Sequence, residues 1–101
     1  MPSKKRTPFS IKQTAEYVGE SLSLWRKAKR MTIADVAGRI GVSVPTVSKL
    51  EHGDPSVSLE TYLRYGELLG LSPDIKKATD PYENEVGRLL MSQRIPQRVR
   101  R

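Results

Sequence analysis

The segment from residue 32 to residue 53, TIADVAGRIGVSVPTVSKLEHG, constrains the fold of this chain more than any other part of the sequence. Serine and threonine cap the start of a helix, and glycine closes its end because it adopts positive φ without steric cost. One helix is therefore predicted from Thr32 to Gly41, and a second from Ser43 to Gly53. The segment predicts two short helices joined by a tight turn.

The other residue types in this segment suit two helices that cross closely over a core. Ala37 is small at the expected crossing point, and Val42 fills the corner between the helices. Val47 and Leu50 seat the second helix on the core, and Pro45 is tolerated because it falls in the first turn. Two short helices at a steep angle allow the second to enter the major groove of DNA, which is about 12 Å wide.

The rest of the chain shows recurring helix signals and no stretch with the period-two alternation of a strand. Ser10 and Gln13 have the spacing of a capping box, so a first helix is predicted to begin at Ser10. Its expected core stripe follows steps of three and four residues and comprises Ile11, Ala15, Val18, Leu22 and Trp25. The chain is predicted to be all-α.

Three more helices are predicted after the two short ones. Ser58 caps a helix that ends near residue 70, and a short helix opens at residue 72. The dipeptide Asp80-Pro81 is a strong start signal for a last helix, which reaches about residue 93. The helix capped by Ser58 is expected to offer to the core Leu59, Tyr62, Leu63, Leu68 and Leu69.

The composition of the 101 residues limits the possible functions. Apolar residues make up 37%, which suits one compact core, and no apolar stretch is long enough to span a membrane. Cysteine is absent and His52 is the only histidine, so we expect neither a metal site nor a cofactor. Without a glycine-rich phosphate loop or paired catalytic carboxylates, no enzyme is expected. The chain also begins without a secretion signal, which predicts a cytoplasmic location.

Charge is distributed unevenly along the chain, whose formal net charge is +7. Residues 1–50 carry ten Lys or Arg and three acids, whereas residues 51–93 carry four Lys or Arg and eight acids. Four arginines follow from residue 94 onward. The basic first half favours an anionic partner, and the acidic part favours a separate face for a protein partner.

Residues 32–53, the preceding VGESLSLWRKAKRM and the following SLETYLRYGELLGL resemble the lambda-repressor and Cro superfamily, the XRE type of helix-turn-helix protein. The resemblance implies a five-helix lambda-repressor-like DNA-binding domain, to which this chain adds a C-terminal helix and tail. It also implies a structural ion pair between Arg26 and Glu51. The expected organisation is a flexible basic arm (1–9), the DNA-binding domain (10–72) and a C-terminal helical extension with a basic tail (73–101).

By the docking of that superfamily, the exposed face of the second motif helix meets the DNA bases. Lys49 is expected to be the principal reader, because its ammonium can bond guanine O6 or N7. The predicted base-contacting residues are Val44, Pro45, Thr46, Ser48 and Lys49. Predicted phosphate contacts come from Ser23, Lys27, Lys29, Thr32, Ser43, His52 and, in the N-terminal arm, Lys4, Lys5 and Arg6. Superfamily members often carry polar residues at the positions of Ile33 and Val44, and the apolar residues here argue against a side-chain phosphate clamp.

The C-terminal segment DPYENEVGRLLMSQRIPQRVRR resembles the end of small HipB-like antitoxins, and so does GDPSVSLETY at residues 53–62. This resemblance implies a homodimer that represses its own operon at a pseudo-palindromic operator and neutralises a HipA-type Ser/Thr kinase toxin. The expected partner or dimer surface comprises Tyr82, Val86, Leu89, Leu90, Met91, Arg98 and Arg100. Packing of the apolar members on their own domain is an equal alternative.

Two other functions are compatible with the sequence. A repressor of phage or mobile-element type, without a toxin, would carry the same motif, and a neighbouring toxin gene would distinguish the two. A helix-turn-helix module that acts only as a protein adaptor is favoured by the apolar Ile33, Val44 and Pro45. Salt-dependent duplex binding would exclude the adaptor, because phosphate neutralisation makes DNA affinity fall steeply with salt.

Overall fold

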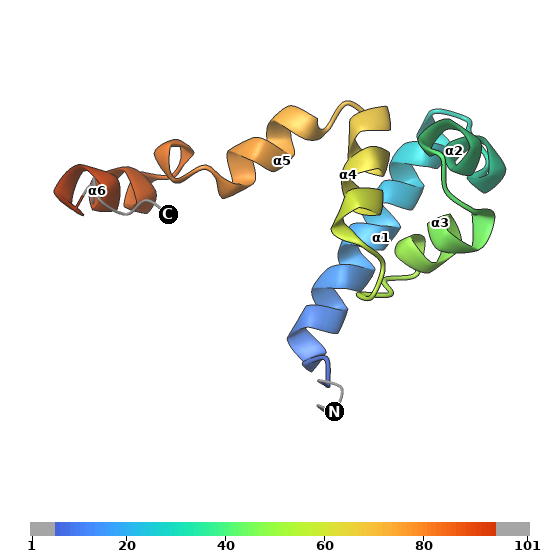
Figure 1. Ribbon diagram of the computed structural model, residues 1–101, viewed down its shortest axis with the longest axis horizontal. Coiled ribbons are helices and arrows are strands. Elements are labelled where there is room, and N and C mark those ends of the chain that lie inside the picture. The colour runs from blue at the N-terminus through green and yellow to red at the C-terminus, as the bar shows by residue number, and fades with distance from the viewer. Residues whose placement is uncertain (1–5, 95–101) are drawn as a thin grey trace. The chain divides into compact units, whose positions relative to one another are not determined.

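A computed structural model describes residues 6–94 of the chain (Figure 1). Over this range the backbone forms six α-helices and one 3₁₀ turn and contains no strand, so the all-α prediction is confirmed there. None of these helices combines the length and apolar character that a membrane crossing requires. The elements are α1 (Phe9–Ala28), α2 (Ile33–Ile40), α3 (Val44–Glu51), α4 (Leu59–Leu68), α5 (Ser72–Thr79), η1 (Pro81–Glu83) and α6 (Glu85–Arg94).

The chain divides into two compact units, the first ending at Gly70 and the second beginning at Leu71. In the first unit, α3 packs on both α1 and α2, and α2 also packs on α4. Of the residues at its centre, Val36, Val47 and Tyr65 are completely buried. The apolar core of this unit comprises Leu22, Val36, Ala37, Ile40, Val47, Leu50, Tyr65 and Leu69.

Two glycines allow α1 to approach the end of α3 closely. A Cβ atom at Gly19 would overlap the backbone carbonyls of Leu50 and Glu51. At Gly53, where φ is 81°, a Cβ atom would lie 2.6 Å from the Cα of Glu16. The distance between α1 and the C-terminal end of α3 is therefore set by backbone contact rather than by side-chain packing.

The predicted N-cap of the first helix is wrong by two residues, and its capping box is absent. The helix begins at Phe9, and its N-cap residue is Pro8, which supplies no side-chain hydrogen bond. Ser10 is already helical, so its hydroxyl does not cap the helix, and its carbonyl accepts a hydrogen bond from the Thr14 hydroxyl at 3.1 Å. The pattern at Ser10 and Gln13 is thus a chance match to the capping-box spacing.

The predicted core stripes of α1 and α4 are also partly wrong. Trp25 is 45% exposed and Leu59 is 69% exposed, although both were expected inside. The buried face of α1 instead follows Gly19, Leu22 and Arg26, and that of α4 includes the polar Thr61 and Tyr65. Because a charged side chain and a tyrosine occupy core positions, a hydrophobic pattern alone assigns the wrong face. Ile11 and Leu63 are likewise exposed.

In the second unit, the predicted last helix is interrupted. Asp80 caps η1, since its side chain accepts a hydrogen bond from the backbone N–H of Tyr82. Asn84 then adopts an extended conformation, and its side chain accepts a hydrogen bond from Gly87 N at 2.9 Å in the first turn of α6. Gly87 lies so close to Pro81 that a Cβ atom there would overlap the proline carbonyl. None of the described residues from 71 to 93 is buried.

Candidate nucleic-acid interface

The start of α2 is fixed by a reciprocal capping box. The hydroxyl of Thr32 accepts a hydrogen bond from Asp35 N at 3.0 Å, and the Asp35 carboxylate accepts one from Thr32 N at 2.8 Å. The latter bond is the main cause of the lowered pKa of Asp35. Thr32 is exposed, and its hydroxyl acts as an acceptor in the cap. The hydroxyl proton is thus available for donation to a phosphate oxygen, as the sequence-based prediction requires.

The turn between α2 and α3 depends on a left-handed glycine. Gly41 has φ 75° and ψ 36° and closes α2, and the guanidinium of Arg64 donates to the carbonyl of Ile40 at 2.8 Å. Ser43 then caps α3 by accepting from Thr46 N at 3.2 Å, and the two hydroxyls lie 2.8 Å apart. Both ends of the turn are therefore held by hydrogen bonds, which fix the direction in which α3 leaves.

The outward face of α3 carries the residues that were predicted to read bases. Val44, Pro45 and Lys49 are exposed, and Thr46 and Ser48 are half-buried. The opposite face is buried through Val47 and Leu50. This face offers one ammonium, two hydroxyls and two apolar side chains, which match guanine acceptors, mixed base edges and thymine methyl groups respectively.

The C-terminal end of α3 is anchored by a buried ion pair. Arg26 on α1 meets the carboxylate of Glu51 through two hydrogen bonds, Nε to Oε2 at 2.7 Å and Nη2 to Oε1 at 3.0 Å. Only 10% of the Arg26 side chain and 5% of the Glu51 side chain are exposed. The third nitrogen of Arg26 donates to the carbonyl of Met31 at 3.0 Å, and the hydroxyl of Tyr65 on α4 donates to Glu51 Oε2 at 2.6 Å.

This network determines the charge state of its members. Burial alone would raise the pKa of Glu51, but the hydrogen bonds from Arg26 and Tyr65 outweigh it and lower the pKa below 4.5. The hydrogen bond to Glu51 raises the pKa of Arg26, and burial raises the pKa of Tyr65. All buried side-chain nitrogen and oxygen atoms in the described part of the chain have hydrogen-bond partners. Such a satisfied network fixes α3 against α1 and α4 and is too enclosed to bind a ligand.

The predicted phosphate-contacting residues that the structure describes all belong to the first unit. Lys27 and Lys29 lie at the end of α1, and the positive charge of Lys27 contributes to the lowered pKa of Glu51 at the end of α3. His52 follows α3, with Nδ1 2.8 Å from the carbonyl of Ser48. The exposed members are Arg6, Lys27, Lys29, Thr32, Ser43 and His52, whereas Ser23 is half-buried. Lys4 and Lys5 lie outside the described residues.

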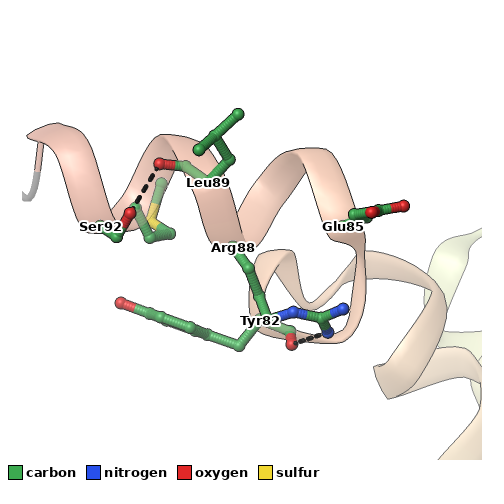
Figure 2. A pocket seen from close by; sticks show the side chains of 6 residues that line it. Tyr82, Glu85, Arg88, Leu89 and Ser92 are labelled. Atoms are coloured by element: carbon green, nitrogen blue, oxygen red, sulfur yellow. Dashed lines mark hydrogen bonds between the residues drawn. The ribbon is translucent and has the colours of Figure 1, made fainter.

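The predicted partner surface lies in the second unit and is only partly contiguous. A hollow on α6 is lined by Tyr82, Leu89 and Met91 together with Glu85, Arg88 and Ser92 (Figure 2). Arg88 donates to the carbonyl of Tyr82 at 2.9 Å and so ties α6 to η1. Val86 and Leu90 are exposed but do not line the hollow. Arg98 and Arg100 lie outside the described residues.

Some residues of the first unit that position the outward face of α3 were not identified from the sequence. Tyr65 completes the ion pair, and its only sequence signal is the spacing of Thr61, Tyr65 and Leu69 at steps of four. Arg30 adopts φ 59° after the end of α1, a conformation that favours glycine, and nothing in the sequence indicates it. The role of Gly19 could not be predicted from the sequence either, because a close approach of two helices is visible only in the three-dimensional structure.

Comparison with protein families supports a DNA-binding regulator. The helix-turn-helix family profile matches residues 22–76, which is more than half of the chain and includes α2, the turn and α3. Searches of curated proteins and of solved structures find no significant match.

Proposed function

The chain belongs to the helix-turn-helix family, and on that premise we propose that it is a sequence-specific transcriptional repressor that binds double-stranded DNA through α3. The outward face of α3 carries this proposal. Its first turn is exposed and capped by Ser43, and its far end is fixed by the buried Glu51. Rigid presentation of a short helix with an exposed lysine is what insertion into the major groove requires.

Within this proposal Lys49 is the main base reader, and the exposed lysines at the end of α1 hold the phosphate backbone. Backbone contacts set register and orientation, whereas contacts to base edges supply sequence preference. The proposed partner is a pseudo-palindromic operator bound by a homodimer, because two-fold symmetry lets two copies of α3 read two half-sites one helical turn apart. The protein acts by binding and not as an enzyme.

The more specific role that we propose is that of an autoregulatory antitoxin in a HipBA-like system. Its support is the resemblance of residues 80–101 to HipB-like antitoxins and the exposed apolar residues of α6. In this role the second unit binds a HipA-like Ser/Thr kinase, while the first unit binds the operator. Inhibition of the kinase encoded beside this gene by the full chain, measured as loss of its phosphorylation activity, is the expected result. Full kinase activity in the presence of excess chain would contradict the antitoxin role and leave the repressor proposal standing.

The repressor proposal is tested by titrating the full chain onto its own promoter fragment and onto an unrelated duplex, each at two salt concentrations. A preference for the promoter of at least about a thousandfold is expected, since specific and non-specific affinities differ by that much or more in repressors. Equal, weak and salt-sensitive binding to both duplexes would contradict sequence-specific repression. No binding to either would contradict the DNA-binding function itself.

A further inference from the structure

The side of α1 that faces away from the core has an unusual composition for a solvent-exposed helix face. Its residues follow alternating steps of four and three, and none of them is charged: Ser10, Thr14, Tyr17, Ser21, Leu24 and Ala28. Tyr17 is 75% exposed and Leu24 is 60% exposed. This spacing is that of the positions through which one helix packs against another, and in the C-terminal half of the stripe they carry Leu24 and Ala28. Serine and threonine occupy three of the six positions.

The surface along this stripe is hollowed where a partner side chain would sit. Ser21, Leu24, Trp25 and Ala28 line a shallow hollow on α1. Their spacing, i, i+3, i+4 and i+7, is that of the four residues that form a hole for a knob in helix–helix packing. Trp25, which was expected in the core, forms one wall of this hollow.

We propose that this face of α1 is a self-association surface, on which the α1 of a second copy of the chain packs in antiparallel orientation. The sizes of the side chains select this arrangement. When Ser21 lies opposite Leu24 of the second copy, Tyr17 lies opposite Ala28, so each large residue meets a small one. A parallel pair would place tyrosine on tyrosine and serine on serine, which leaves both clashes and gaps.

The charges that flank the stripe select the same register. Glu20 and Lys27 lie seven residues apart on one edge of the stripe. In this register Glu20 of each copy faces Lys27 of the other copy. If the second helix were shifted by one heptad in either direction, the two copies of Glu20 or the two copies of Lys27 would face each other. On the opposite edge Val18 meets Trp25, which adds apolar contact. Size and charge therefore point to one register and to one occupant, which is the chain itself.

This surface does not include the outward face of α3, although Lys27 on its edge is also a predicted phosphate contact. The inference rests on the homodimer of the proposed function and names a surface for it, whereas the test below measures self-association without DNA. Residues 14–28 span four turns of helix, or about 22 Å. A single helix pair of this length buries less area than a typical stable interface, so the association is expected to be weak and concentration-dependent.

The absence of cysteine from the chain allows a disulfide test of the register with the full-length protein. Tyr17→Cys and Ala28→Cys variants, one of them tagged to give it a distinct mass, are mixed and oxidised by air. The mixture is expected to form the mixed disulfide at least tenfold faster than either variant forms its own. Equal rates in the mixture and in the separate samples, or no disulfide in either, would overturn the proposal.

A charge substitution added to the same cysteine variants tests the register, and a second substitution elsewhere serves as its matched control. Glu20→Lys places two lysines opposite each other and is expected to slow mixed-disulfide formation at least fivefold. Glu67→Lys changes an exposed glutamate of α4 by the same charge and is expected to alter the rate less than twofold. Equal effects of the two substitutions would overturn the register. Lys27 is left unchanged because it is also a predicted phosphate contact, and helical content by circular dichroism checks that every variant is folded.

Discussion

The two units of the chain contain similar secondary structure but differ in what holds it together. The first unit has completely buried side chains, glycine-mediated backbone contact between α1 and α3, and a buried ion pair. In the second unit no described residue between 71 and 93 is buried, and its interactions are caps and short-range hydrogen bonds. Helical structure alone therefore does not indicate which part of this chain is stable.

The difference has a simple energetic basis. Full burial of a large apolar side chain contributes about 1.5–3 kcal/mol, and the first unit has eight buried apolar residues. An intramolecular hydrogen bond contributes only about 0.5–1.5 kcal/mol net. Besides such bonds, the second unit offers only half-buried apolar side chains, such as those of Ile75 and Met91. We therefore expect α5, η1 and α6 to open at low free energy and the first unit to determine global unfolding.

The largest expected effect comes from adding a side chain where helices touch through their backbones. Gly19→Val places a branched side chain against the carbonyls of Leu50 and Glu51 and is expected to cost about 4 kcal/mol or more. Gly87→Val meets the carbonyl of Pro81 just as closely, but in the second unit, and is expected to change global unfolding by less than about 0.5 kcal/mol. Urea denaturation followed by circular dichroism measures both, and similar costs would break the contrast between the units.

The second largest effect concerns the buried ion pair. Glu51→Gln leaves the guanidinium of Arg26 without its counter-charge and is expected to cost about 3 kcal/mol at neutral pH, as breaking a buried pair does. Because the pKa of Glu51 is lowered on folding, its carboxylate stabilises the fold above about pH 4.5 and loses that contribution as the pH falls through the folded-state value. The wild-type chain is thus expected to lose stability on acidification more steeply than the variant, as urea titrations between pH 7 and pH 3 would show. Parallel pH profiles of the wild type and the variant would show that Glu51 does not cause the loss of stability on acidification.

The ion pair also shows how far the sequence alone predicts this fold. Local signals place the caps at Thr32, Ser43 and Ser58 and the turn at Gly41 correctly, because each depends on a few neighbouring residues. The motif could therefore be predicted almost residue by residue. The core faces of α1 and α4 could not be predicted in this way. On α1, the buried face includes Arg26, which is acceptable in a core only because Glu51 in α3 and Tyr65 in α4 complete its network. Both partners are distant in the sequence.

The proposed base-reading surface is predictable for a similar local reason, whereas the residues that hold it in place are not. The period of α3 separates the buried Val47 and Leu50 from the outward-facing Lys49 without knowledge of any other element. The contribution of Tyr65, which comes from α4, depends on tertiary geometry. The strained Arg30 depends on how the chain must turn between α1 and α2.

A third prediction concerns the surface that the stable unit presents. Lys49→Ala is expected to cost about 1–3 kcal/mol of binding to the preferred operator and to relax the preference at one base pair. Lys27→Ala is expected to weaken binding to all duplexes alike and to reduce the slope of log K against log salt by about one. Titrations on operator variants at two salt concentrations distinguish the two lysines. An equal loss on every sequence for Lys49→Ala would exclude it as a base reader.

A smaller effect is expected from relief of backbone strain in the same unit. Arg30 has φ 59°, and Arg30 N and Met31 N donate to the carbonyls of Lys27 and Arg26, which is the hydrogen-bond pattern that commonly ends a helix at glycine. Arg30→Gly is expected to stabilise the chain by about 1 kcal/mol, because glycine adopts this conformation without a Cβ clash. Gly38→Ala is the control at an unstrained site, since the added Cβ meets no atom within 4 Å apart from its chain neighbours and the backbone of its own helix. It should also stabilise the chain by about 1 kcal/mol. A destabilised Arg30→Gly variant would show that the arginine side chain contributes more than its strain costs.

The smallest expected effect on stability is in the second unit, where a large side chain is removed from solvent rather than from a core. Leu89 is 57% exposed, so Leu89→Ala is expected to change global unfolding by less than about 0.5 kcal/mol. Leu50→Ala, the matched change in the first unit, removes a buried leucine and is expected to cost about 2–5 kcal/mol. Urea denaturation of the two variants at one protein concentration measures both. If Leu89→Ala proved as costly as Leu50→Ala, its side chain would be buried in solution, and the second unit would be covered by another part of the chain or by a second copy. Loss of the Leu89→Ala effect on dilution would then identify the second copy as the cover.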